Sequence, residues 1–112
     1  MPLLADTPAD RAEQMLALTE RLTLLLDAET QLLQAHLPPL SGAEGEEKAR
    51  LANLYRQEMT RIAADKSLIA NAPKPLTDKL RAATTRFRAA LATHERALIG
   101  VKTITEGLVQ AI

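Results

Sequence analysis

Apolar side chains recur along this chain at intervals of three and four residues, the spacing of one face of an α-helix. The first stripe comprises Met15, Leu18, Leu22, Leu25 and Leu32, widened by Leu26, Leu33 and Leu37. The second comprises Leu51, Leu54, Tyr55, Met59, Ile62 and Ile69. The third comprises Leu80, Thr84, Phe87, Leu91, His94, Leu98, Val101, Thr105, Leu108 and Ile112, in alternating steps of four and three. Such a seven-residue repeat is typical of long helices that pack side by side at a shallow angle.

Prolines separate the three segments. They lie at positions 2 and 8, 38 and 39, and 73 and 75. A proline inside a helix costs about 3 kcal/mol, because it lacks an N–H donor and its ring strikes the preceding turn. We therefore predict helices near residues 8–37, 42–71 and 75–111. Together they form an all-α fold, a single helical domain over residues 1–112, built as an elongated antiparallel three-helix bundle or coiled-coil hairpin.

Helix-start signals follow the first two proline clusters. Thr7 offers a hydroxyl at the N-cap, Pro8 suits the first helical position and Asp10 stands in the first turn. Ser41 and Glu44 have the spacing of a capping box, in which hydroxyl and carboxylate satisfy two free N–H groups. These signals agree with the boundaries that the prolines indicate.

Composition narrows the classes of protein that the chain can belong to. Among 112 residues there is no cysteine and no tryptophan, and Tyr55 and Phe87 are the aromatic residues. A disulfide framework, a thiolate nucleophile and a cysteine-ligated metal are therefore excluded. The formal net charge is zero, so the basic field of a nucleic-acid binder is missing and no nucleic acid is expected as a partner.

The zero net charge conceals an uneven distribution. Residues 1–40 carry six acidic and two basic side chains, a net charge of −4, and residues 41–72 carry five of each. Residues 73–112 carry three acidic and seven basic side chains, a net charge of +4. The first and third helices are therefore expected to attract each other, although each exposed pair contributes only about 0–1 kcal/mol. The alternative is that each helix has a solvated face of unrelated sign.

A few polar residues fall on apolar faces. Glu29 and His36 are seven residues apart on the first stripe, and with His94 they could supply metal ligands. The favoured interpretation is plainer: Glu29 lies at a flank, His36 lies near an exposed helix end, and His94 is partly buried and hydrogen-bonded. Phe87, between two arginines, is interpreted as a core residue rather than a nucleic-acid contact. No metal, cofactor or catalytic residue is predicted, because the chain has no recognisable catalytic motif, and we expect no enzyme activity.

Neither a targeting signal nor a membrane span is expected. The first ten residues have no basic stretch, and the longest run without charge, from Thr30 to the residue before Glu44, contains two prolines. A bilayer span requires about 20 mainly apolar residues. A cytoplasmic location without membrane insertion is the resulting expectation.

The C-terminal segment is richer in apolar residues than one stripe requires. Gly100 and Gly107 weaken its helix by about 1 kcal/mol each relative to alanine, and Ile99 and Val109 would point away from the stripe. This surplus predicts that the segment packs on something besides its own chain. The alternative is a close helix–helix approach at the two glycines, with the extra side chains covered within the chain.

Several runs of sequence resemble one known family. Residues 46–56 (EEKARLANLYR) resemble the central motif of FlgN-type flagellar export chaperones, and residues 18–29 (LTERLTLLLDAE) resemble their leucine-rich first helix. Residues 80–91 (LRAATTRFRAAL) and 105–109 (TEGLV) are similar to short, alanine-rich alphaproteobacterial members. The similarity extends from about Leu16 to Ile112.

This resemblance implies a function. FlgN-type chaperones hold the amphipathic C-terminal helices of hook–filament junction proteins and keep them soluble for the flagellar type III export apparatus. The resemblance therefore predicts a protein client, and the export apparatus as a further partner. Family members bind the client through their C-terminal helix, and the resemblance therefore implies a partner-binding surface at Leu98, Val101, Ile104, Leu108 and Ile112. The alternative function is a structural coiled-coil protein that self-associates through its apolar C-terminal helix, and a homodimer is left open in either case.

Overall fold

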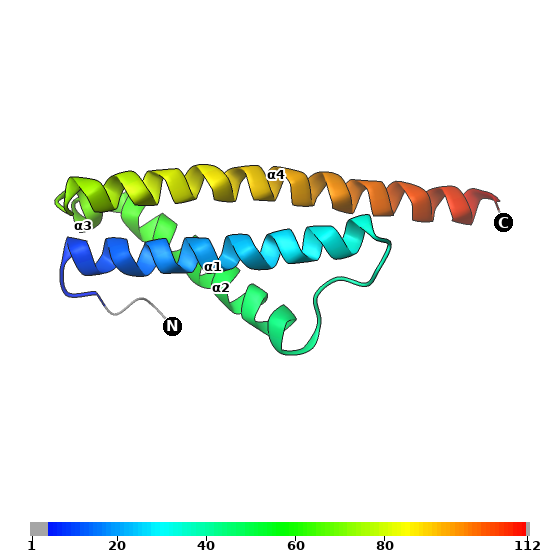
Figure 1. Cartoon of the computed structure of the whole chain (residues 1–112), viewed down its shortest axis with the longest axis horizontal. Helices are drawn as coiled ribbons and strands as arrows, with labels where there is room; N and C mark the ends of the chain where they lie inside the picture. Colours follow the sequence, from blue (N-terminus) through cyan, green and yellow to red (C-terminus); the bar gives the residue numbers. More distant parts are fainter. Residues whose placement is uncertain (1–4, 112) are drawn as a thin grey trace.

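The computed structural model contains four α-helices and describes residues 5–111, with the backbone alone at positions 103–105, 108, 109 and 111. The helices are α1 (Pro8–Gln34), α2 (Gly42–Ala64), α3 (Ser67–Ala70) and α4 (Lys74–Ala111). The molecule is elongated, with extents of 58 × 24 × 22 Å (Figure 1). The all-α fold class is thus confirmed. No helix in the described part of the chain has both the length and the hydropathy needed to cross a membrane.

The two longest helices, α1 and α4, lie side by side and run in the same direction, and α2 returns obliquely across one face of this pair, behind α1 in Figure 1. Glu29 of α1 contacts His94 of α4, 65 residues later, and Leu22 shares a cluster with Phe87 at the same separation. This constant offset shows that α1 and α4 are parallel and in register. Helix α2 is antiparallel to both, as in an up–down–up bundle.

The core lies mainly between α1 and α4. Its central cluster consists of Leu22 and Leu26 from α1 with Phe87 and Ala90 from α4, and Leu51, Ala52, Tyr55 and Leu91 pack against it. The rings of Tyr55 and Phe87 are 4.7 Å apart between centroids, which ties α2 to α4. Phe87 is therefore a core residue, as predicted, while Arg86 and Arg88 on either side of it are exposed.

The buried face of α4 is turned by one residue from the predicted stripe. Ala83 and Ala90 are buried, whereas Thr84 and Leu91 are only half-buried. Small alanine side chains let α1 approach α4 closely, and Leu91 instead packs against the flank of the same cluster. Both stripes follow the same spacing, so the spacing alone could not distinguish them.

The first helix ends three residues earlier than predicted. His36 has a positive φ of 61°, and the N–H groups of His36 and Leu37 donate to the carbonyls of Leu33 and Leu32. This is the Schellman arrangement that closes a helix. Its cause is Pro38, because the residue before a proline avoids the helical conformation.

The predicted helix over residues 42–71 is wrong in one respect: it is two helices, α2 and α3. Asp65 is extended (φ −143°, ψ 92°). Its Oδ1 accepts hydrogen bonds from the Ser67 N–H at 3.1 Å and the Ser67 hydroxyl at 2.5 Å. Aspartate competes with the helix in this way by bonding to nearby backbone groups, and here it ends α2 and begins α3.

The two predicted start signals have different outcomes. Thr7 is the N-cap of α1, and its hydroxyl accepts a hydrogen bond from the Asp10 N–H at 3.1 Å. Ser41 is the N-cap of α2 by position, but its side chain makes no capping bond, so the capping box does not form. The preceding loop packs closely on this first turn: a Cβ at Gly45 would lie 2.8 Å from the Leu40 carbonyl oxygen, so the position requires glycine.

Thr30 offers a direct test of the packing between helices. Its hydroxyl is buried and has no hydrogen-bond partner among the described residues, whereas the buried Thr19 hydroxyl donates to the Met15 carbonyl at 2.7 Å. We expect Thr30→Val to raise the free energy of unfolding by about 1 kcal/mol, because it removes an unsatisfied polar group. Thr19→Val, which removes a satisfied group, should give no such gain in urea denaturation. Equal losses in both variants would contradict the expected difference.

Candidate partner-binding surface at the end of α4

Helix α4 is longer than the helix it packs against. It has 38 residues against 27 in α1, and the constant offset places the last residue of α1, Gln34, level with Ile99. The rest of α4 therefore continues past the end of α1, as Figure 1 shows at the red end of the chain. The length difference leaves this part of α4 without α1 beside it.

The predicted surface begins beside the end of α1, because Leu98 is level with Leu33, and continues into this overhang. Leu98 is 45% exposed and Ile99 is 63% exposed, both unusual for large apolar side chains, and Val101 is half-buried. The backbones of Ile104 and Leu108 are helical, which places them on the same side of α4 as Val101. The side chains of Ile104 and Leu108, and the whole of Ile112, lie outside the described residues. The binding role of all five residues stays a prediction.

The glycines on α4 do not mark a close helix contact. A Cβ at Gly100 or at Gly107 would meet nothing within 4 Å in the described part of the structure. The alternative explanation from the sequence, a tight approach of another helix at these positions, is therefore wrong for this chain. The glycines weaken a segment that is already free of α1.

Immediately before the overhang, a buried carboxylate joins three elements. Glu29 of α1 is 3% exposed, and its Oε1 accepts hydrogen bonds from Lys48 Nζ of α2 at 2.5 Å and His94 Nε2 of α4 at 2.6 Å. Its Oε2 accepts from the Leu40 N–H in the α1–α2 loop at 3.1 Å. Because an ionised carboxylate only accepts, His94 Nε2 carries the proton. These contacts hold both helices and the loop against α1.

The environment of Glu29 favours its charged form. Burial alone would raise the pKa of its carboxyl group, but hydrogen bonds from Lys48 and His94, the charge of Lys48 and the Leu40 N–H outweigh it. The pKa of Glu29 therefore lies below its ordinary value of 4.5. Elsewhere, burial raises the pKa of the Tyr55 hydroxyl, against a smaller effect of Arg88.

The polar residues singled out from the sequence have different outcomes. Placing Glu29 at a flank is wrong, because its partners come from all three neighbouring elements. His94 is buried and hydrogen-bonded, as predicted. His36 is exposed beyond the end of α1, also as predicted, and does not join Glu29. Within the described residues, no group of three or more acidic or histidine side chains is arranged to hold a metal ion.

Ion pairs between helices connect α1 chiefly with α2. Arg11 Nη1 lies 2.7 Å from Glu58 Oε2 in a buried pair, and Arg21 Nη2 lies 2.6 Å from Glu47 Oε1 at the surface. Opposite charges on α1 and α4 were predicted to attract each other. Among the described side chains, the one charged contact between these two helices is Glu29–His94. The opposite charges of these two helices are therefore mostly displayed on the surface rather than paired within the chain.

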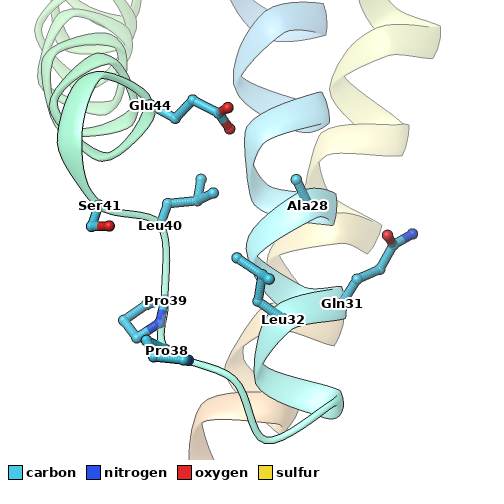
Figure 2. A pocket seen from close by; sticks show the side chains of 8 residues that line it. All are labelled: Ala28, Gln31, Leu32, Pro38, Pro39, Leu40, Ser41 and Glu44. Atoms are coloured by element: carbon cyan, nitrogen blue, oxygen red, sulfur yellow. The ribbon is translucent and has the colours of Figure 1, made fainter.

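An open hollow borders the α1–α2 loop. It encloses about 620 Å³ and is lined by Ala28, Gln31, Leu32, Pro38, Pro39, Leu40, Ser41 and Glu44. Figure 2 shows Leu32 and Leu40 approaching each other across it, with the Glu44 carboxylate near its α2 side. The sequence analysis did not identify this hollow, because α1, the loop and α2 each contribute only part of it. Its lining is mostly aliphatic, and its polar side chains are Gln31, Ser41 and Glu44.

Together, these features define an all-α bundle in which one long helix continues past the end of its partner, with the exposed Leu98 and Ile99 level with that end. Comparison with known proteins specifies the family. The flagellar basal-body protein FlbY of Caulobacter vibrioides is 40% identical over 112 residues, which are all of this chain and 75% of that protein. This chain therefore belongs to the FlbY family. No family model matches the chain, and no solved structure does.

Proposed function

We propose that this chain is a flagellar assembly chaperone or adaptor that binds an amphipathic helix of a client protein. The proposal extends to the FlgN-type activity that the sequence resemblance implies: holding the C-terminal helices of hook–filament junction proteins for type III export. Membership of the FlbY family supports a flagellar role. The observation that carries the binding role is the exposure of Leu98 and Ile99, which are level with the last two residues of α1 where α4 continues past it.

The physical argument concerns what an overhanging apolar helix can do. Large exposed side chains such as Leu98 and Ile99 lose contact with water when an amphipathic helix lies alongside, which is worth about 25 cal/mol per Å² of apolar surface. A client helix packed in this way continues the bundle in place of α1. An unfolded export substrate would thereby be protected from aggregation until delivery.

Binding of a client peptide tests this proposal. We expect the chain to bind a synthetic C-terminal segment of a hook–filament junction protein from the same bacterium, one to one, in isothermal titration calorimetry. Leu98→Glu should weaken binding at least tenfold, because a charge would be desolvated in the interface. Met59→Glu is the matched control: Met59 is also exposed, at 37%, but lies on α2 next to Glu58, whose partner Arg11 is at the opposite end of α1 from the overhang. Equal binding by Leu98→Glu and Met59→Glu would contradict the proposal.

The structural alternative predicts a different behaviour. A self-associating coiled-coil protein would use the same α4 surface to bind further copies. It would form an oligomer that resists dilution and salt and binds no peptide. Loss of such an oligomer in Leu98→Glu, without any peptide binding by the unaltered chain, would support that alternative.

A further inference from the structure

A groove runs between α1 and α4, separate from the overhang. It consists of two neighbouring hollows of about 340 Å³ each, which share Thr23, Asp27 and Arg86. The remaining lining residues are Glu20, Leu24, Ala83, Ala89, Ala90 and Thr93, so all of them belong to α1 or α4. We refer to these nine residues as the α1/α4 groove.

The α1/α4 groove lies on the face that α2 leaves open. Arg11 points toward α2, where it pairs with Glu58. At 3.6 residues per turn, Asp27 is rotated by about 160° from Arg11 around the α1 axis. Figure 1 agrees, because α2 crosses behind α1 and leaves the near side of the α1–α4 pair uncovered.

The two edges of the groove carry opposite charges. The α1 edge has Glu20 and Asp27, and Glu13 continues the same line one heptad earlier. The α4 edge has Arg86, with Lys79 one heptad earlier. All five side chains are exposed, and none belongs to an ion pair with another side chain that the structure describes. The charges on the two edges are therefore not neutralised by ion pairs within the described part of the chain.

Acidic and basic positions also occur at matching heights. The offset of 65 residues between α1 and α4 places Glu13 level with the residue before Lys79, and Glu20 level with the residue before Arg86. By the same offset, the exposed Leu24 is level with Ala89. Glu13 and Glu20 thus each have a basic side chain of α4 at nearly the same height, and the protruding Leu24 has a small residue.

From this arrangement we propose that a second copy of this chain docks on the α1/α4 groove, related by a two-fold axis parallel to the helices. Such an axis preserves height along the helices and places α1 of each copy over α4 of the other. Glu13 then faces the partner's Lys79, Glu20 faces the partner's Arg86, and Leu24 packs on the partner's Ala89. A two-fold axis perpendicular to the helices would place α1 over α1 and bring like charges together, which is unfavourable.

The orientation has a structural consequence. Because the axis is parallel to the helices, both overhanging ends of α4 project from the same end of the dimer. The groove itself shares no residue with the overhang, so the dimer stands independently of the proposed client binding. Each copy keeps its own α2 on the outer face.

Charge-reversal substitutions test the proposed dimer. We expect the unaltered chain to sediment at twice its 12.2 kDa mass at high concentration and low salt in analytical ultracentrifugation. Two charge-reversal variants, Glu20→Arg/Asp27→Arg and Arg86→Glu, should each associate at least tenfold more weakly and sediment as monomers. The two-fold axis repeats every contact, so each variant dimer would contain two contacts between like charges. An equimolar mixture of the two variants should dimerise. In the mixed dimer, one contact between positions 20 and 86 has both charges reversed and the other has both native charges, so opposite charges face each other in both.

Matched controls separate this outcome from misfolding and from other contacts. Glu46→Arg changes an exposed glutamate on α2, away from the groove, and should leave the dimer unchanged. Circular dichroism should show the same helicity for all variants. A monomeric unaltered chain, a dimer that survives both charge reversals, or a mixture that stays monomeric would each overturn the proposal.

Cross-linking tests the direction of the axis. The chain has no native cysteine, so introduced cysteines are the only thiols. A mixture of Glu20→Cys and Arg86→Cys chains should form a mixed disulfide dimer on mild oxidation, whereas Glu20→Cys alone should give much less, because the two Glu20 positions lie diagonally across the interface. Predominant cross-linking of Glu20→Cys to itself would contradict the parallel axis.

Discussion

Replacing Glu29 by alanine is expected to lower the free energy of unfolding by about 3 kcal/mol, because removing one partner of a buried ion pair leaves the others uncompensated. Three donors depend on this carboxylate: Lys48 Nζ, His94 Nε2 and the Leu40 N–H. All three come from different elements, so the loss affects the whole bundle. Urea denaturation followed by circular dichroism measures the change.

The control for this substitution is Glu95→Ala. Glu95 is exposed and follows His94 on α4, so its removal should change stability by less than about 0.5 kcal/mol, as for ordinary surface positions. If Glu29→Ala were as stable as Glu95→Ala, the buried carboxylate would not hold the bundle together.

Lowering the pH should reduce the free energy of unfolding through the same residue, Glu29. The pKa of Glu29 lies below 4.5 in the folded chain, so folding favours the charged form, and this contribution is fully present above pH 4.5. It is lost as the pH falls below 4.5, through the folded-state pKa, because protons then bind first to the unfolded chain. Glu29→Gln should therefore lose less stability than the unaltered chain over this range. An unchanged acid profile in Glu29→Gln would contradict the assignment.

Deleting residues 99–112 is expected to abolish client binding while leaving most of the helicity. The removed segment starts level with the last residue of α1, so the core around Leu22 and Phe87 remains intact. The measurements are circular dichroism for the fold and calorimetric titration with the client peptide for binding. We expect a folded chain without detectable binding at peptide concentrations that saturate the unaltered protein.

Two results would contradict that expectation. Complete unfolding of the shortened chain would mean that the end of α4 belongs to the core. Unchanged binding would place the client elsewhere on the molecule. Dimer formation through the α1/α4 groove should survive the deletion, because the groove residues all precede Gly100.

Much of the fold follows from local signals in the sequence. The periodic leucines and paired prolines predicted the helices, and Thr7 predicted the start of α1. Local signals failed where a side chain competed with the helix: His36 adopts a left-handed conformation before Pro38, and Asp65 caps the next turn.

The interior was harder to predict, for a different reason. Two stripes on α4 follow the same spacing, and the choice of Ala83 and Ala90 over Thr84 and Leu91 depends on how closely α1 approaches. Glu29 looked like a flank residue because its partners lie 11, 19 and 65 residues away. Only the folded chain brings those partners together, so the buried carboxylate could not be inferred from periodicity.

Hydrogen exchange of the protein with and without client peptide tests the central claim most directly. The account predicts that bound peptide slows amide exchange in the overhanging part of α4, from Leu98 to Ala111, and leaves α2 unchanged. Slower exchange confined to α2 or to the loop around Pro38, with no change in the overhang, would contradict it.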